Sequence, residues 1–212
     1  MVRCVVEAFE KSYIRIADAE VCKITSDIRE GIVQIQNFME SHELAVPSVV
    51  SFIGCMQADF RYPIARLLAK VHKSPIAGRL LSSGTEWITN PIAVFLAKEL
   101  QPICNSCASI AKSTEDVVHS IDDINSKQFG FTLSLATFDI EQLYPSMPLD
   151  KAKTIVLKAY QEHVKGQRKW GAKVKMVSIM FDVLFQGQIM KFCRINADGS
   201  KSVEWYKQSC GI

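Results

Sequence analysis

The sequence lacks the long apolar run that a membrane-spanning helix requires. Its longest apolar stretches, such as Pro91 to Leu96, fall well short of the ~20 residues that cross a bilayer. The opening residues, MVRCVVE, also lack the extended apolar core of a secretory signal peptide. We therefore expect neither membrane insertion nor secretion.

Seven cysteines are present, but neither their number nor their spacing forms a pattern. An odd set at irregular intervals does not suit a disulfide framework, so we expect reduced thiols in an intracellular protein, nuclear or cytoplasmic. Cys104 and Cys107 form a lone C-x-x-C pair. A zinc site would require two further ligands, and the other cysteines are distant and unpatterned. A pair of core or near-surface thiols is therefore the preferred interpretation.

The net charge is small, +3 over 212 residues, so global charge indicates no particular partner. Its distribution is uneven. Residues 60–85 hold five cations and no acid, residues 151–175 hold eight cations and one acid, and residues 115–123 between them are acidic. Two interpretations stay open, because clustered cations can bind phosphate groups or can form an ordinary solvated face.

No internal repeat, low-complexity tract or clear linker interrupts the chain, and a content of 48% hydrophobic residues suffices for a sizeable core. Residues 1 to about 60 are predicted to be helical, because Ile24, Ile28, Ile32 and Ile35 recur at helical spacing. Further helices are predicted over 89–100, from 113 onwards, over 151–164 and over 174–185.

Strands are predicted in three places. A small hairpin is expected over about 61–83, and a second over 188–195 and 202–207, each with turn residues at its centre. Residues 131–140 form the best strand candidate, since Leu133, Leu135 and Thr137 alternate there with the smaller residues at 132, 134 and 136. The order of helices, hairpin, helices, strand, helices and hairpin predicts a helix-rich α+β fold with a small antiparallel sheet.

Asp139 is the candidate catalytic residue, because it stands at the end of the predicted strand and shortly before a turn. A carboxylate in that position can point into a cleft without being buried unpaired, and carboxylates suit hard cations such as Mg²⁺. Paired cations ~3.5–4 Å apart stabilise the attacking and leaving oxygens of phosphoryl transfer. The simpler alternative is that Asp139 caps the turn that follows.

Residues 138–144, FDIEQLY, resemble the first catalytic motif of reverse transcriptases, an Asp followed five residues later by an aromatic. The continuation LYPSMP at 143–148 is most similar to Penelope-like retroelements. The resemblance implies that Asp139 binds both metals, with Ile140 beside it in the metal and nucleotide site. It also implies that Tyr144 lies under the sugar of the incoming nucleotide.

A second match covers the first predicted hairpin. Its two parts, KVHKSP at 70–75 and GRLLSS at 78–83, resemble the fingers hairpin of the same elements, in which K-x-H-K precedes R-P-I. Here Leu-Leu replaces Pro-Ile. The resemblance implies that Arg79, together with Lys73 or Lys70, grips the triphosphate. Arginine offers phosphate oxygens a bidentate fork, while lysine offers a point charge.

Two shorter matches lie on either side of the catalytic strand. The segment KSTEDVV at 112–118 resembles the helix start that precedes this strand in the family, and we assign it a structural role. The segment WYKQSCGI at 205–212 resembles the opening of the next palm motif, Y-x-Q-x-x-G. It implies that Gln208 and Gly211 lie near the templating base and the incoming nucleotide. The four matches follow the family order over about 61–212.

The resemblance implies a helical N-terminal region and fingers over 1–130 and a partial palm over 131–212. The intact enzyme would be an RNA-directed DNA polymerase, a retrotransposon nucleotidyltransferase that uses Mg²⁺ or Mn²⁺ with an RNA template, a DNA primer and dNTP. The second catalytic motif, aromatic-x-Asp-Asp, is not found before Ile212. We therefore expect the chain alone to be inactive, and an incomplete palm to expose a sheet edge or an apolar face.

Two further hypotheses stay open. A domesticated or vestigial retroelement protein could hold nucleic acid through its basic segments without catalysis. A telomerase-like polymerase fragment is the other, since telomerases share the catalytic strand motif. Residues 70–73 and 143–148 match the Penelope-like elements better, which ranks the telomerase hypothesis lower.

Overall fold

The computed structural model describes residues 13–70, 77–140, 147–196 and 198–208. The predicted helix-rich α+β class with small antiparallel sheets is confirmed. None of the helices in these ranges is long and apolar enough to cross a membrane. The elements follow the order β1 (Tyr13–Ile16), α2 (Asp18–Ser41), α3 (Pro47–Gly54), β2 (Ala65–Lys70), β3 (Ala77–Ser82), α4 (Asn90–Ser106), α5 (Thr114–Ser126), α7 (Leu149–Val164), α8 (Trp170–Gln186), β4 (Ile189–Ile195) and β5 (Lys201–Gln208).

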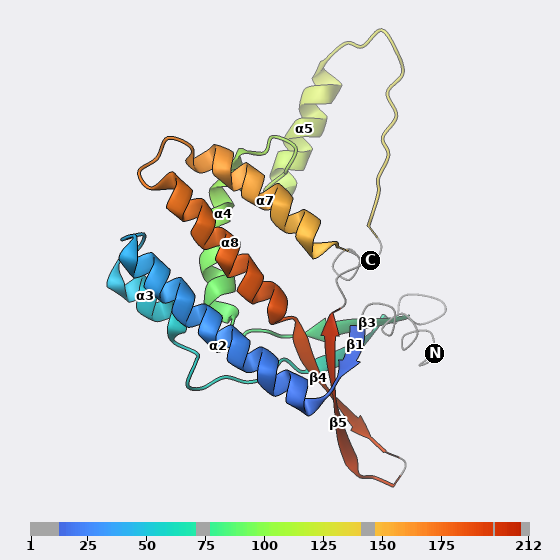
Figure 1. Ribbon diagram of the computed structural model, residues 1–212. Helices are drawn as coiled ribbons and strands as arrows, with labels where there is room; N and C mark the ends of the chain where they lie inside the picture. Colours follow the sequence, from blue (N-terminus) through green and yellow to red (C-terminus); the bar gives the residue numbers. More distant parts are fainter. Residues whose placement is uncertain (1–12, 71–76, 141–146, 197, 209–212) are drawn as a thin grey trace.

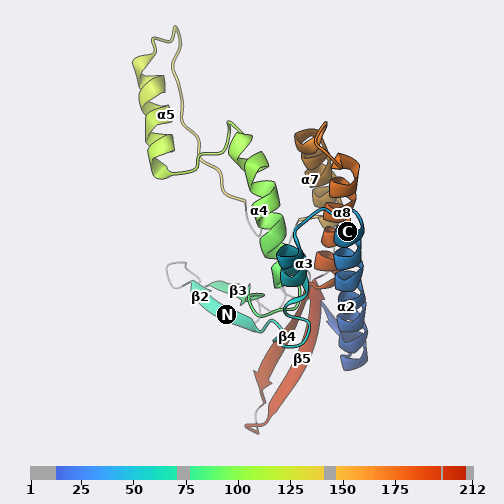
Figure 2. The same cartoon turned by 90° about the vertical axis from the view of Figure 1, so that its left-hand side faces the viewer.

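A layer of helices forms the body of the molecule. Helix α8 lies between α2 and α7, α3 covers the end of α2, and α4 packs against α7 and α8 (Figures 1 and 2). The isoleucines that predicted α2 are its buried stripe, and they form the core with side chains of α4, α7 and α8. Residues on both sides of the predicted domain boundary at 130 share this core, and the boundary itself stays a prediction.

Helices α2 and α8 approach each other closely at Gly31. A Cβ atom at this position would lie 2.5 Å from Cγ2 of the buried Val183. Real side chains do not come so near, so α8 can reach this depth only because residue 31 has no side chain. The glycine therefore sets the spacing between the two helices.

A part-buried hydrogen bond joins α4 to α7. The side chain of Tyr160 is fully buried, and its hydroxyl donates to Oε1 of Glu99 at 2.6 Å. Burial, followed by this hydrogen bond and the charge of Glu99, raises the pKa of the Tyr160 phenol well above its usual range. Tyr160 therefore stays a neutral donor across the physiological range and completes the core without an unpaired polar atom.

The second predicted hairpin is confirmed as β4 and β5, which pair antiparallel from Ile189↔Lys207 to Ile195↔Lys201. The other edge of β5 pairs with β1, so the sheet has the order β1-β5-β4. The prediction of helix throughout residues 1 to about 60 is therefore wrong at Tyr13–Ile16. Four residues carry too little periodicity to predict a strand, and β1 is a strand because β5 offers it a ladder of backbone partners.

The first predicted hairpin is confirmed over its described residues. Strands β2 and β3 pair antiparallel from Ala65↔Ser82 to Lys70↔Ala77. The base of this hairpin adjoins the other sheet, because Ile64 and Lys191 form a parallel bridge in which the Lys191 N–H donates to the Pro63 carbonyl at 2.7 Å. Both sheets consequently lie at the same end of the helical layer (Figure 1).

Residues 107–140, hereafter the arm, stand off from the body (Figures 1 and 2). The helix start predicted at 113 is confirmed at α5. A capping box forms there, in which the Asp116 N–H donates to Ser113 Oγ and Asp116 Oδ2 accepts from the Ser113 N–H. The strand predicted over 131–140 is not formed. Every residue of the arm is exposed, and an alternating sequence becomes a strand only where another strand pairs with it.

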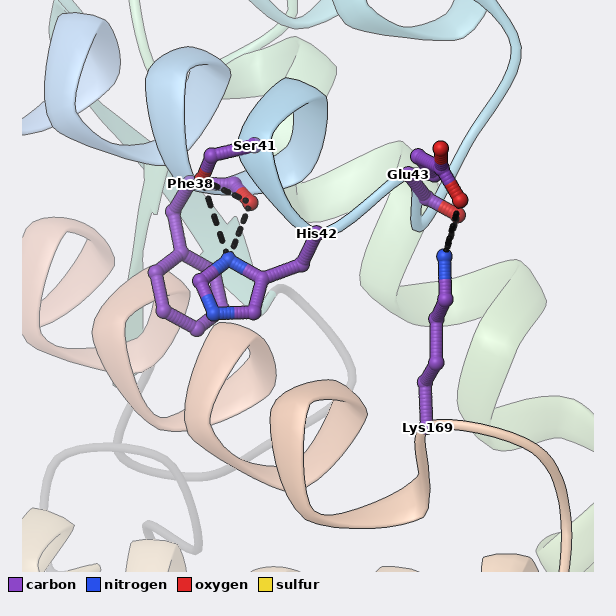
Figure 3. A network of polar contacts seen from close by, with 5 residues as sticks. All are labelled: Phe38, Ser41, His42, Glu43 and Lys169. Atoms are coloured by element: carbon purple, nitrogen blue, oxygen red, sulfur yellow. Dashed lines mark hydrogen bonds and ion pairs between the residues drawn. The ribbon is translucent and has the colours of Figure 1, made fainter.

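The ends of α2 and α8 meet at an ion pair between Glu43 and Lys169 (Figure 3). Both residues have left-handed backbone conformations, with φ of 46° and 59°, which residues other than glycine rarely adopt. Lys169 Nζ lies 2.6 Å from Glu43 Oε2. Beside this pair, the ring of His42 stacks on Phe38, and its Nδ1 lies 3.0 Å from the carbonyl of Phe38 and from the hydroxyl of Ser41.

The close approach at Gly31 predicts that Gly31→Ala destabilises the protein. The new methyl group would push Val183 and α8 outward, at a cost of about 1–3 kcal/mol, part of which the better helix propensity of alanine offsets. Denaturant unfolding measures the change. Gly171→Ala in α8 is the matched control, because nothing lies within 4 Å of a Cβ there, and this variant should lose no stability. Equal stability of the two variants would contradict the prediction.

The Glu43–Lys169 pair predicts a pH dependence. A hydrogen bond from Lys169, with the charges of Lys169 and Arg168, holds the pKa of Glu43 below its usual range. A lowered folded-state pKa adds stability above the unfolded-state pKa, and this contribution is lost as pH falls through the folded-state value. In Lys169→Ala, NMR titration should find the Glu43 pKa nearer its usual value. The control is Lys165→Ala. Because the Lys165 ammonium pairs with Glu162, this variant should leave the Glu43 pKa unchanged.

Candidate functional site

Four aromatic side chains from distant parts of the chain meet where the helices end and the two sheets begin. We call this cluster the aromatic joint: Phe60, Tyr62, Trp87 and Trp205. Its ring centroids are 5.2 Å apart for Phe60 and Trp87, 5.0 Å for Tyr62 and Trp87, and 4.7 Å for Tyr62 and Trp205. The joint connects the segment before β2 to the middle of β5, so it holds both hairpins against one core.

Hydrogen bonds fix the rings of the joint. Trp87 Nε1 donates to the Gly187 carbonyl at 3.0 Å, and that carbonyl also accepts from the Ile189 N–H at 2.9 Å. The Tyr62 hydroxyl lies 3.2 Å from Thr25 Oγ1, which itself donates to the Val21 carbonyl. The joint is thereby bound to α2 on one side and to the α8–β4 connection on the other.

The backbone comes close to the joint at Gly187. A Cβ atom there would lie 3.0 Å from Thr89 Cγ2 and 3.2 Å from Trp87 Nε1. A side chain would therefore have to displace the indole that the carbonyl of the same residue holds.

Sequence reasoning missed the joint, because the signal was only four aromatic residues scattered over 145 positions with no shared motif.

The resemblance assigned nucleotide contacts to the β2–β3 hairpin. Arg79 stands opposite Leu68 in the ladder and Lys70 stands opposite Ala77, so the two backbone positions are diagonal neighbours across the hairpin. In antiparallel pairs such diagonal positions are ~7–8 Å apart. Lys73 lies outside the described residues.

Asp139 and Ile140 lie at the end of the arm, in extended backbone, and both are exposed. Within the described part of the chain, no hydrogen bond or ion pair involves the Asp139 carboxylate. Tyr144 lies outside the described residues. Among the described residues, no hydrogen bond or ion pair links Asp139 to the β2–β3 hairpin or to β5.

Gln208 is the last residue of β5 and stands opposite Tyr13 in the β1–β5 ladder. Its N–H donates to the Gln188 carbonyl at 3.0 Å, which closes the open end of the β4–β5 hairpin. The position assigned to the templating base is thus attached to the same sheet as the aromatic joint. Gly211 lies outside the described residues.

The donor set for Mg²⁺ or Mn²⁺ is incomplete among the described residues. No cluster of three or more His, Cys, Asp or Glu side chains occurs there. Asp139 offers one carboxylate, whereas two cations held by protein and phosphate oxygens require further ligands. The described residues do not fit a two-metal centre.

The basic segment 151–175 lies on α7, on α8 and on the turn between them. Part of its charge is used inside the fold, because Lys153 pairs with Asp182 and Lys169 pairs with Glu43. Four other cations are exposed and form no ion pair with a described acid: Lys151, Lys158, Arg168 and Lys175. The sequence predicted the cluster but not this division into structural and solvent-facing charges.

Comparison with known proteins finds no match: no family model, no curated protein and no solved structure corresponds to this chain. The resemblance to reverse transcriptases therefore rests on the motifs in the sequence.

The aromatic joint predicts that Trp87→Phe destabilises the fold. The Trp87 side chain is 3% exposed, and the variant loses both the donor to Gly187 and part of the ring volume. We expect a loss of about 1–3 kcal/mol in the free energy of unfolding, measured with denaturant. The control is Trp170→Phe, whose side chain is 41% exposed, and which should change stability little. A larger loss in the control would contradict this role for Trp87.

Proposed function

We propose that this chain supplies the fingers and the first part of the palm of an RNA-directed DNA polymerase of the Penelope-like type. The observation that carries the proposal is the β2–β3 hairpin. It is an antiparallel ladder in the segment that resembles the fingers hairpin, with Lys70 and Arg79 at diagonal positions. The motif order over 61–212 is the second support, because four separate matches occur in the family sequence.

The role of the hairpin follows from the chemistry of triphosphates. Arg79 would hold phosphate oxygens through its planar fork of N–H donors, and Lys70 would add a point charge beside it. The aromatic joint anchors the base of the hairpin through Tyr62 and Trp87, so the hairpin has a defined direction relative to β5. Positioning of this kind is the main protein contribution to nucleotidyl transfer.

Asp139 is the proposed metal ligand of the intact enzyme. In the arm it is exposed and free of ion pairs with described residues, so its oxygens are accessible. A working centre requires the carboxylates of the second catalytic motif as well. A single carboxylate explains why we expect the chain alone to give no more primer extension than its Asp139→Ala variant.

Nucleotide contact by the hairpin is testable with a photoreactive dNTP on an RNA template–DNA primer. We expect labelling of Arg79→Ala to fall about tenfold, because a charge-assisted contact to phosphate is lost. The matched control is Arg194→Ala, an exposed arginine of β4 in the other hairpin, which should be labelled like the parent chain. Unchanged labelling of Arg79→Ala would contradict the proposal.

A second candidate function is nucleic-acid binding without catalysis. The observation that favours it is the set of exposed cations on α7 and α8 that are not used by described acids. Binding through them would weaken steeply with salt, because each phosphate contact releases condensed counterions. Salt-dependent binding of an RNA–DNA hybrid with no dNTP labelling at all would favour this second function over the polymerase.

A further inference from the structure

The arm exposes apolar side chains on both of its parts. On α5 they form one stripe, at the helical spacing of i, i+1, i+4 and i+7, and no residue of α5 is buried. In the extended part, Leu135 is 87% exposed and Phe138 is 94% exposed. Exposed apolar residues concentrated in this way mark an interaction surface. The exposed large apolar residues of α5 and of the chain that follows it are Val117, Val118, Ile121, Ile124, Phe129, Phe131, Leu133, Leu135, Phe138 and Ile140.

The backbone N–H and C=O groups in the extended part of the arm are not paired with any described strand. Residues 131–140 form no ladder with any described strand, although their sequence alternates as a half-buried strand does. An extended segment with free N–H and C=O groups is a ready template for another strand. The arm therefore fits a partner that supplies both a strand and an apolar face.

The charges of this segment indicate that the partner strand is the same segment of a second copy. Between residues 127 and 140 the only cation is Lys127 at one end, and the only acid is Asp139 at the other. Parallel pairing of two copies would set like charges side by side, whereas antiparallel pairing sets each lysine against an aspartate. The segment is thus complementary to itself in one direction.

The same register matches the apolar side chains. With Lys127 opposite Asp139, Leu133 stands opposite Leu133 of a second copy, and Phe131 stands opposite Leu135. The ion pair of Lys127 with Asp123 is exposed at the end of α5, so exchanging it for Asp139 of the second copy costs little. Aliphatic and aromatic pairs therefore fill one face of the ribbon, with ion pairs at both ends.

We propose that the arm is a dimerisation element, in which residues 127–140 of two copies pair antiparallel about Leu133 and the apolar stripes of the two α5 helices cover the ribbon. A two-stranded ribbon alone is marginal in water, and the helices supply the apolar cover that it requires. The dimer requires neither the hairpin nor the joint, so it can form whether or not the chain belongs to a polymerase. It does engage Asp139, the proposed metal ligand, in an ion pair, so the carboxylate would serve only one of the two roles at a time.

Sedimentation velocity of the full chain over a range of concentrations tests the dimer. The parent chain should form dimers, and Leu133→Asp should be monomeric at the same concentrations, because it sets two carboxylates against each other on the apolar face. Thr132→Asp is the matched control, since it points to the opposite face and should still dimerise. Both variants should keep the parent melting temperature of the body, as the arm contributes nothing to its core.

Charge exchange tests the register. Lys127→Asp and Asp139→Lys each create like-charged pairs at both ends of the ribbon and should weaken the dimer on the order of tenfold. The double variant restores unlike pairs and should recover the parent dimer affinity. A monomeric parent chain, or a dimer that Leu133→Asp leaves intact, would overturn the proposal. A double variant as weak as the single ones would overturn the register.

Discussion

The contact of Trp87 with the Gly187 backbone is the interaction on which the arrangement of this molecule depends. It lies where α8 ends and β4 begins, and it brings the segment before α4 to the same point. Tyr62, from the segment before β2, packs on the Trp87 ring, and Trp205 of β5 packs in turn on Tyr62. If the indole moved, each hairpin would keep its own ladder, but their common direction would be lost, because hydrogen bonds within a hairpin do not orient it relative to another.

The body and the arm show opposite solutions to the same energetic problem. In the body, α2 and α8 approach so closely at Gly31 that a methyl group does not fit, and apolar burial offsets the conformational entropy of ordering the chain. In the arm, a capping box orders α5 locally while every residue stays exposed. A helix of this length gains most of its stability from packing. Helix α5 therefore depends for its stability on a surface that covers its apolar stripe.

Both hairpins and the long helices could be predicted from the sequence, since alternation, helical spacing and turn residues are local signals. Strand β1 could not, because four residues become a strand only through the edge of β5. Residues 131–140 show the reverse case: the pattern is strand-like, but no described strand lies beside them. The charge cluster at 151–175 was visible, yet the use of Lys153 and Lys169 in structural ion pairs required knowledge of Asp182 and Glu43, which are distant in the chain.

The sequence by itself determined the α+β class, both hairpins and the motif order that links Arg79, Asp139 and Gln208 to one proposed function. These follow from spacing along the chain, which needs no knowledge of distant contacts. Only the tertiary structure decided that Phe60, Tyr62, Trp87 and Trp205 form one joint, and that the segment with Asp139 stands exposed on an arm. Which distant segments meet depends on packing and backbone pairing summed over the whole chain, and no local pattern records that sum.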